Sequence, residues 1–131
     1  MRRLLIGLTL LLAGCATTDR LLSYGSGMSD ASVRADGYLF RIYVHPHDDD
    51  LLIQPAMSEL SKEPAHWPLG VWRHAAEAFV TPVGCGIDQM SALSTDGASW
   101  EAHFVCPSGV DLRALMNAQR AALKVGEPLH R

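Results

Sequence analysis

The residues with the densest metal-ligating potential lie between positions 45 and 50, in the run His-Pro-His-Asp-Asp-Asp. Imidazole nitrogen is a common ligand of zinc, copper and nickel, and carboxylate oxygen suits harder ions. A metal site built from His45, His47 and Asp49 is therefore one hypothesis for this run. The alternative is a solvated hairpin turn, in which proline restricts φ and aspartate accepts hydrogen bonds from nearby backbone. The turn needs no further ligands, and we expect it in preference to the metal site.

The same run matches three positions of the His-x-His-x-Asp-His motif and so partly resembles metallo-β-lactamase-fold hydrolases. Asp50 stands where that motif has its last histidine, and 131 residues are too few for the two-sheet sandwich of that family. No Gly-x-Ser-x-Gly nucleophile motif occurs either. We therefore predict a protein that is not an enzyme and has no cofactor. A small hydrolase that uses His103 is the less favoured alternative.

Several aromatic and histidine side chains receive structural predictions instead. We expect His103 to be an exposed strand residue that pairs across strands with Asp88. Trp72 and Trp100 fall on predicted buried faces. Trp67, in a loop beside a proline, is the tryptophan expected to be exposed.

The first fifteen residues predict the location of the protein. A basic start, Met1-Arg2-Arg3, precedes a nine-residue apolar run from Leu4 to Leu12. A membrane-spanning helix needs about 20 apolar residues, so this run is typical of a signal peptide. The following segment, Leu12-Ala13-Gly14-Cys15, resembles the lipobox of bacterial lipoproteins. The resemblance implies cleavage before Cys15 and attachment of lipid to its thiol and its new amine.

Ala16 follows the lipobox cysteine, and in proteins of this class a residue other than aspartate there implies the outer membrane. We therefore expect a lipid-anchored protein that faces the periplasm. Cleavage leaves nine basic and fourteen acidic residues, a formal charge of -5, with no Lys/Arg cluster after residue 3. This charge balance argues against a nucleic-acid partner.

The expected function is that of a non-catalytic envelope accessory or binding module. Its expected partners are the membrane, through the lipid, and an envelope protein or a cell-wall component. A metal-binding or metal-sensing module that uses the turn at 45–50 is the alternative function.

Export also bears on the other two cysteines, Cys85 and Cys106. Disulfides form and persist in oxidising compartments, so an even number of remaining thiols predicts one disulfide. Two buried free thiols are the alternative.

The chain divides into a signal peptide (1–14), a lipidated N-terminus with a flexible tether (15–37) and a small domain (38–131). Residues 38–45 alternate between apolar and polar positions, and a turn leads to a second strand at 50–54. Pairing around this turn sets Ile42 against Ile53 and Val44 against Leu51.

A helix is predicted after Pro68, with an apolar stripe that ends near Val80. Strands at 86–93 and 99–106 form a second hairpin, in which Cys85 faces Cys106 and Ile87 faces Phe104. The first of these strands alternates poorly, which predicts a bulge. A last helix is predicted from residue 112 to a glycine C-cap at Gly126.

The hydrophobic fraction of 48% is ordinary for a folded domain. The predicted fold class is α+β in two layers: an antiparallel sheet from two β-hairpins, with two helices on one face, in the order ββαββα.

Overall fold

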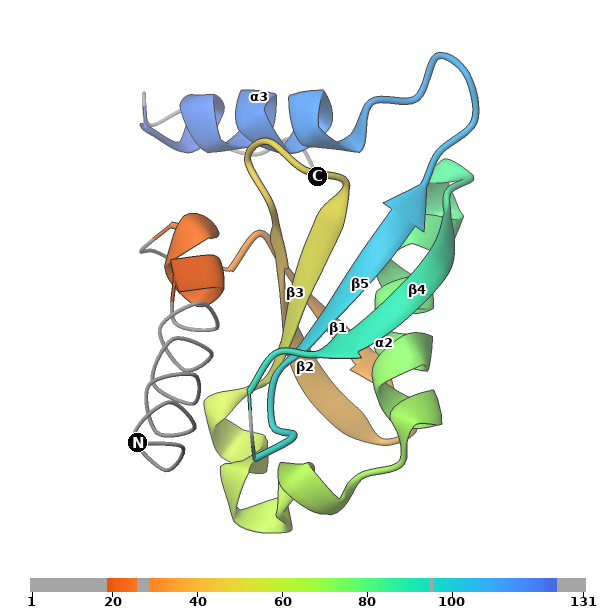
Figure 1. Ribbon diagram of the computed structural model, residues 1–131. Coiled ribbons are helices and arrows are strands. Elements are labelled where there is room, and N and C mark those ends of the chain that lie inside the picture. Colours follow the sequence, from red (N-terminus) through yellow and green to blue (C-terminus); the bar gives the residue numbers. More distant parts are fainter. Residues whose placement is uncertain (1–18, 26–28, 95, 125–131) are drawn as a thin grey trace, which may run out of the picture.

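The computed structural model describes residues 19–25, 29–94 and 96–124. It shows an α+β fold with one antiparallel sheet of five strands in the order β1-β2-β3-β5-β4 (Figure 1). The strands are β1 (Ala31–Ala35), β2 (Tyr38–Val44), β3 (Asp50–Pro55), β4 (Gly86–Ala92) and β5 (Trp100–Val105). The helices labelled in Figure 1 are α2 (Leu69–Val80) and α3 (Leu112–Lys124), and short 3-10 helices lie at Met57–Lys62, Pro64–His66 and Thr81–Val83. Residues 19–23 are also helical.

The first predicted hairpin is confirmed as β2 and β3. Ile42 pairs with Ile53 and Val44 pairs with Leu51, and all four side chains are at most 1% exposed. Successive strand residues point to opposite faces of a sheet. One face of this hairpin therefore belongs entirely to the core, and Asp50 lies on the other, outer face.

The second predicted hairpin is confirmed as β4 and β5. Ile87 pairs with Phe104, and the register shifts between Ile87 and Gln89, which is the expected bulge. The predicted disulfide joins Cys85 to Cys106, with an S–S distance of 2.06 Å, at the open end of this hairpin. The strand register brings the two cysteines together, because each cysteine directly adjoins one of the two paired strands.

Helix α2 covers one face of the sheet (Figure 1). Trp72 of α2 is completely buried, and its ring lies 5.4 Å from that of Phe40 in β2. Trp67 was predicted to be exposed, and this prediction is wrong. Its side chain is only 9% exposed because it stacks on Tyr38 at 4.0 Å and its Nε1 donates a hydrogen bond to the Lys62 carbonyl.

Two further features differ from the predicted layout. Strand β1 and the helical residues 19–23 fall inside the segment 15–37 that was expected to be a flexible tether. The alternation in β1 is weak because its inward residues include Ala31 and Ala35, which carry small side chains. Pairing with β2 over its whole length nevertheless forms the strand.

The second difference is the position of α3. It runs across the upper end of the sheet in Figure 1, whereas both helices were expected on one face. Among the described side chains of α3, Leu112 (3% exposed) belongs to the core and Met116 packs against it, and both lie near the start of the helix. The expected C-cap at Gly126 lies outside the described residues.

Candidate functional site

A charged cluster on the outer face of the sheet is the most connected polar feature of the described chain. At its centre is the guanidinium of Arg20. Its Nε donates to Glu101 at 2.8 Å, its Nη2 to Asp50 at 2.5 Å and its Nη1 to Asp48 at 2.7 Å. The planar guanidinium presents donors in several directions, which suits it to bind several carboxylates at once.

Residues 19–24 hold Arg20 in this position, and we call them the N-terminal strap. Tyr24 is 7% exposed and donates its hydroxyl hydrogen to Glu101 at 2.7 Å. The Tyr24 ring also meets the His45 ring edge-on, with centroids 4.9 Å apart. Arg20 and Tyr24 lie four residues apart on a helical segment, so both reach the same carboxylate.

The pKa values of these two side chains reflect this environment. Burial alone would lower the pKa of Arg20, but the hydrogen bonds to Glu101 and Asp48 outweigh it and raise that pKa. Burial, and then the hydrogen bond to Glu101, raises the pKa of Tyr24. The strap therefore holds a charged guanidinium and a neutral phenol against the sheet.

His45, the first residue of the ligand-rich turn, is 4% exposed. Its Nδ1 accepts hydrogen bonds from the backbone N–H groups of His47 (3.1 Å) and Asp48 (2.9 Å). Burial, and then the positive charge of Arg20, lowers the pKa of His45. The ring is therefore neutral, and since Nδ1 acts as an acceptor, the proton is on Nε2.

This tautomer decides the chemistry of an arrangement that otherwise resembles a Ser-His-Asp triad. Ser23 Oγ lies 3.0 Å from His45 Nε2, and Asp48 Oδ2 lies 3.8 Å from His45 Nδ1. A triad requires the opposite polarity, with the proton on Nδ1 and a free lone pair on Nε2 to take the serine proton. Here Nε2 donates to Ser23, which in turn donates to the Arg20 carbonyl at 2.5 Å. The three groups thus fasten the strap and do not activate a nucleophile.

The predicted metal ligands do not converge. Both nitrogens of His45 face protein groups, the side chain of His47 is exposed, and Asp49 forms an ion pair with Arg113 at 3.1 Å. Arg113 also donates to the His47 carbonyl. Within residues 19–25, 29–94 and 96–124, no three His, Cys, Asp or Glu side chains are grouped so as to hold a metal ion. In the structure the turn is held between two arginines, Arg20 on one side and Arg113 on the other.

His103 pairs with a different residue from the predicted one. Its Nδ1 lies 3.0 Å from Asp50 Oδ1, not beside Asp88. The reason is topological: β3 is the neighbour of β5, and His103 faces Asp50 in the register. On the β4 side, the bulge at Asp88 sets His103 opposite Gln89.

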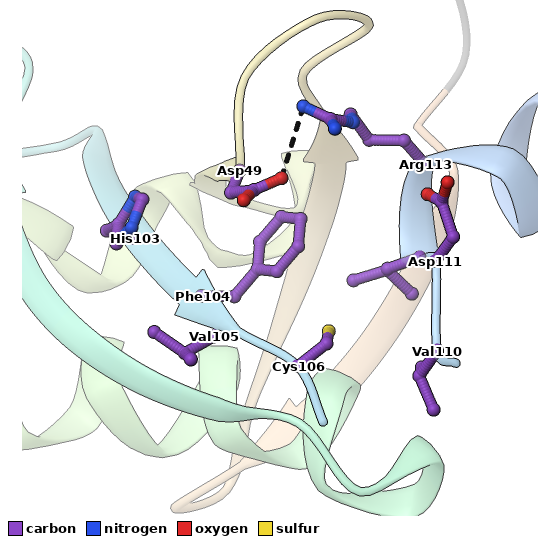
Figure 2. Close-up of a pocket in the computed structure, with 9 residues that line it drawn as sticks. Asp49, His103, Phe104, Val105, Cys106, Val110, Asp111 and Arg113 are labelled. Atoms are coloured by element: carbon purple, nitrogen blue, oxygen red, sulfur yellow. Dashed lines mark ion pairs between the residues drawn. The ribbon is translucent and has the colours of Figure 1, made fainter. Parts of the chain in front are cut away.

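A hollow of about 430 Å³ lies between β5, the turn and the start of α3 (Figure 2). The Asp49–Arg113 ion pair lies at one side of it. Phe104, which is 3% exposed, and Cys106 contribute its apolar wall. The hollow is lined by both polar and apolar side chains from the turn, β5 and the start of α3. The sequence alone did not predict that these three segments meet.

A second and more apolar groove of about 550 Å³ follows α3. Two large side chains in it are unusually exposed, Leu115 at 51% and Val83 at 37%. The two hollows share Val110 and Asp111, so together they form one surface beside the disulfide. We call this the α3 surface. Its apolar part is lined by Val83, Gly109, Val110, Asp111, Ala114, Leu115 and Ala118.

Sequence reasoning missed Arg20, Ser23 and Tyr24 because the strap was expected to be part of a tether. The available signal was short: an arginine and a tyrosine at helical spacing, with two leucines between them.

No helix in the described part of the chain combines the length and apolar character needed to cross a bilayer. Comparison of the chain with protein-family models, curated proteins and solved structures found no match.

Proposed function

We propose that this chain is an outer-membrane-anchored lipoprotein facing the periplasm, and that its domain is a non-catalytic binding module for another envelope protein. The observation that carries the proposal is the pairing of Cys85 with Cys106. Disulfides are rare in reducing compartments, so this pair supports export. It also leaves Cys15, the cysteine of the expected lipobox, as the remaining thiol of the chain.

The α3 surface supports the binding role. Leu115, Val83 and Val105 are 51%, 37% and 55% exposed, and they lie on or beside its apolar groove. Contiguous exposed apolar surface commonly marks a protein interaction site. Cell-wall glycans present many hydroxyl and amide groups, which would lose hydrogen bonds against such a lining. The apolar groove therefore favours a protein partner with an apolar segment.

Anchoring is tested by intact-mass measurement of the protein extracted from membranes. The expected mass is that of residues 15–131 plus acyl groups, and the matched variant Cys15→Ser should retain the leader and carry no lipid. An Ala16→Asp variant should move to the inner membrane. A wild-type chain with its leader uncut or with an unmodified Cys15 would overturn the anchoring proposal.

Binding is tested by photo-crosslinking in intact cells from single positions. A crosslinker at Leu115 should give one discrete adduct, whereas one at Met57, which is 72% exposed in a 3-10 turn away from α3, should not. In the protein that carries the crosslinker at position 115, Ala114→Asp should remove the adduct, because it places a charge in the groove. Equal adducts at both positions, or none at Leu115, would contradict the binding role.

A further inference from the structure

We infer that the N-terminal strap makes the outer face of the sheet a membrane-facing surface, whose partner is the lipid headgroup layer around the anchor. This inference rests on the proposed lipid at Cys15. The inference goes beyond the proposed lipid anchor, because a lipid alone attaches the domain to the membrane and does not orient it.

The first step is the length of chain between anchor and domain. If residues 15–37 were a free tether, the 23 residues from Cys15 to Tyr38 could extend about 75 Å. Arg20, however, is fastened to the sheet by three carboxylates. Only four residues then lie between Cys15 and Arg20, and the five Cα–Cα steps from Cys15 to Arg20 can span at most about 17 Å.

The second step compares this reach with the size of the domain. A folded domain of about 100 residues has a radius of gyration near 13 Å and is roughly 34 Å across. A link of about 17 Å covers about half of that width. Arg20 must therefore lie in the half of the domain nearer the bilayer, which excludes orientations in which α2, on the opposite face, is turned towards the membrane.

The third step concerns the side chains at the attachment point. Leu22 lies between Arg20 and Tyr24 and is 70% exposed, whereas Tyr24 is 7% exposed. The strap thus presents an apolar side chain outward while its Arg20 and Tyr24 side chains face the sheet. Beside a lipidated cysteine, such a side chain gains free energy by entering the headgroup boundary.

The proposal is tested with the full lipidated protein in liposomes of phosphatidylethanolamine and phosphatidylglycerol that carry an acceptor-labelled lipid. A donor dye is attached at His47→Cys, in the turn beside Arg20, or at Leu69→Cys, at the start of α2. Because the domain is about 34 Å across, transfer efficiency should be roughly twofold higher from position 47 than from position 69.

Two perturbations should abolish this difference. Arg20→Gln removes the charge that holds the strap, and the efficiency ratio should fall towards one. Arg34→Gln, at an exposed arginine of edge strand β1, is the matched control and should leave the ratio unchanged. Insertion of ten Gly/Ser residues after Thr17 lengthens the link without touching the fold, so it tests the reach even if Arg20→Gln impairs folding.

The outcomes separate this inference from the proposed function. A chain that carries no lipid or does not stay with the liposomes overturns the lipoprotein proposal. A lipidated, bound chain with equal transfer from positions 47 and 69 overturns the orientation alone. A ratio that survives either Arg20→Gln in a folded protein or the Gly/Ser insertion also overturns it, because the domain would then be held by something other than the strap.

Discussion

The contribution of the Arg20 ion pairs to stability can be ranked from burial, and a double-mutant cycle measures that ranking. Glu101 and Asp50 have side chains that are 17% exposed, and the Arg20 side chain is 28% exposed. Asp48 is 51% exposed, so water and salt screen its pairing. We therefore expect Arg20 to couple strongly to Glu101 and weakly to Asp48.

The magnitude follows from the intermediate burial of the pair. Exposed ion pairs contribute roughly 0.2–1 kcal/mol, and hydrogen bonds to charged groups contribute about 1.5–3 kcal/mol. A coupling free energy of about 1.5 kcal/mol is expected for Arg20→Gln with Glu101→Gln. For Arg20→Gln with Asp48→Asn, we expect a coupling within experimental error.

The assay is urea unfolding of a soluble form that begins at Ala16, with tryptophan fluorescence as the unfolding signal. Trp72 is fully buried in the native state, so unfolding moves it into water and shifts its emission. The urea concentration at the unfolding midpoint should differ among the variants, while the dependence of the unfolding free energy on urea concentration stays constant. If the cycle with Asp48 gives a coupling as large as the cycle with Glu101, burial does not determine the strength of these pairs and our reasoning is refuted.

Four further predictions concern pH, the disulfide and metal. Since burial and Arg20 lower the folded-state pKa of His45, the unfolded chain takes up protons first below about pH 6.5, and the free energy of unfolding should fall there. His45→Gln should remove that loss; an unchanged pH profile in this variant would contradict it. His74 should have the opposite effect on stability, because its carboxylate partner raises its folded-state pKa. The stability that His74 adds below about pH 6.5 should disappear as pH rises through the folded-state pKa. His74→Gln should flatten this part of the pH–stability profile. Replacing Cys85 and Cys106 together by alanine should lower the free energy of unfolding by about 3 kcal/mol, measured by urea titration, and a loss near zero would show that the closed loop is already restricted in the unfolded chain. Calorimetric titration with zinc should show no micromolar binding, because His45 is occupied by protein groups; micromolar binding that His47→Ala abolishes would restore the metal hypothesis.

The sequence by itself determined the features that depend on neighbouring residues. Alternation and turn chemistry were enough to predict the β2–β3 register from Ile42 against Ile53, because both strands and their turn are contiguous in the chain. The same holds for the disulfide, since Cys85 and Cys106 adjoin the two strands of one hairpin. The bulge in β4 was also visible as a break in local alternation.

Only the tertiary structure decided how distant segments meet. Asp48, Asp50 and Glu101 lie 28, 30 and 81 residues from Arg20, and no local pattern records such a separation. Their convergence required β5 to lie beside β3, and that order also moved the partner of His103 from Asp88 to Asp50. Local periodicity predicts which face of a strand is buried, whereas long-range ion pairs depend on the order of the strands in the sheet. For this reason the described residues of the expected tether proved to be part of the fold, and the ligand-rich turn proved to be held by arginines.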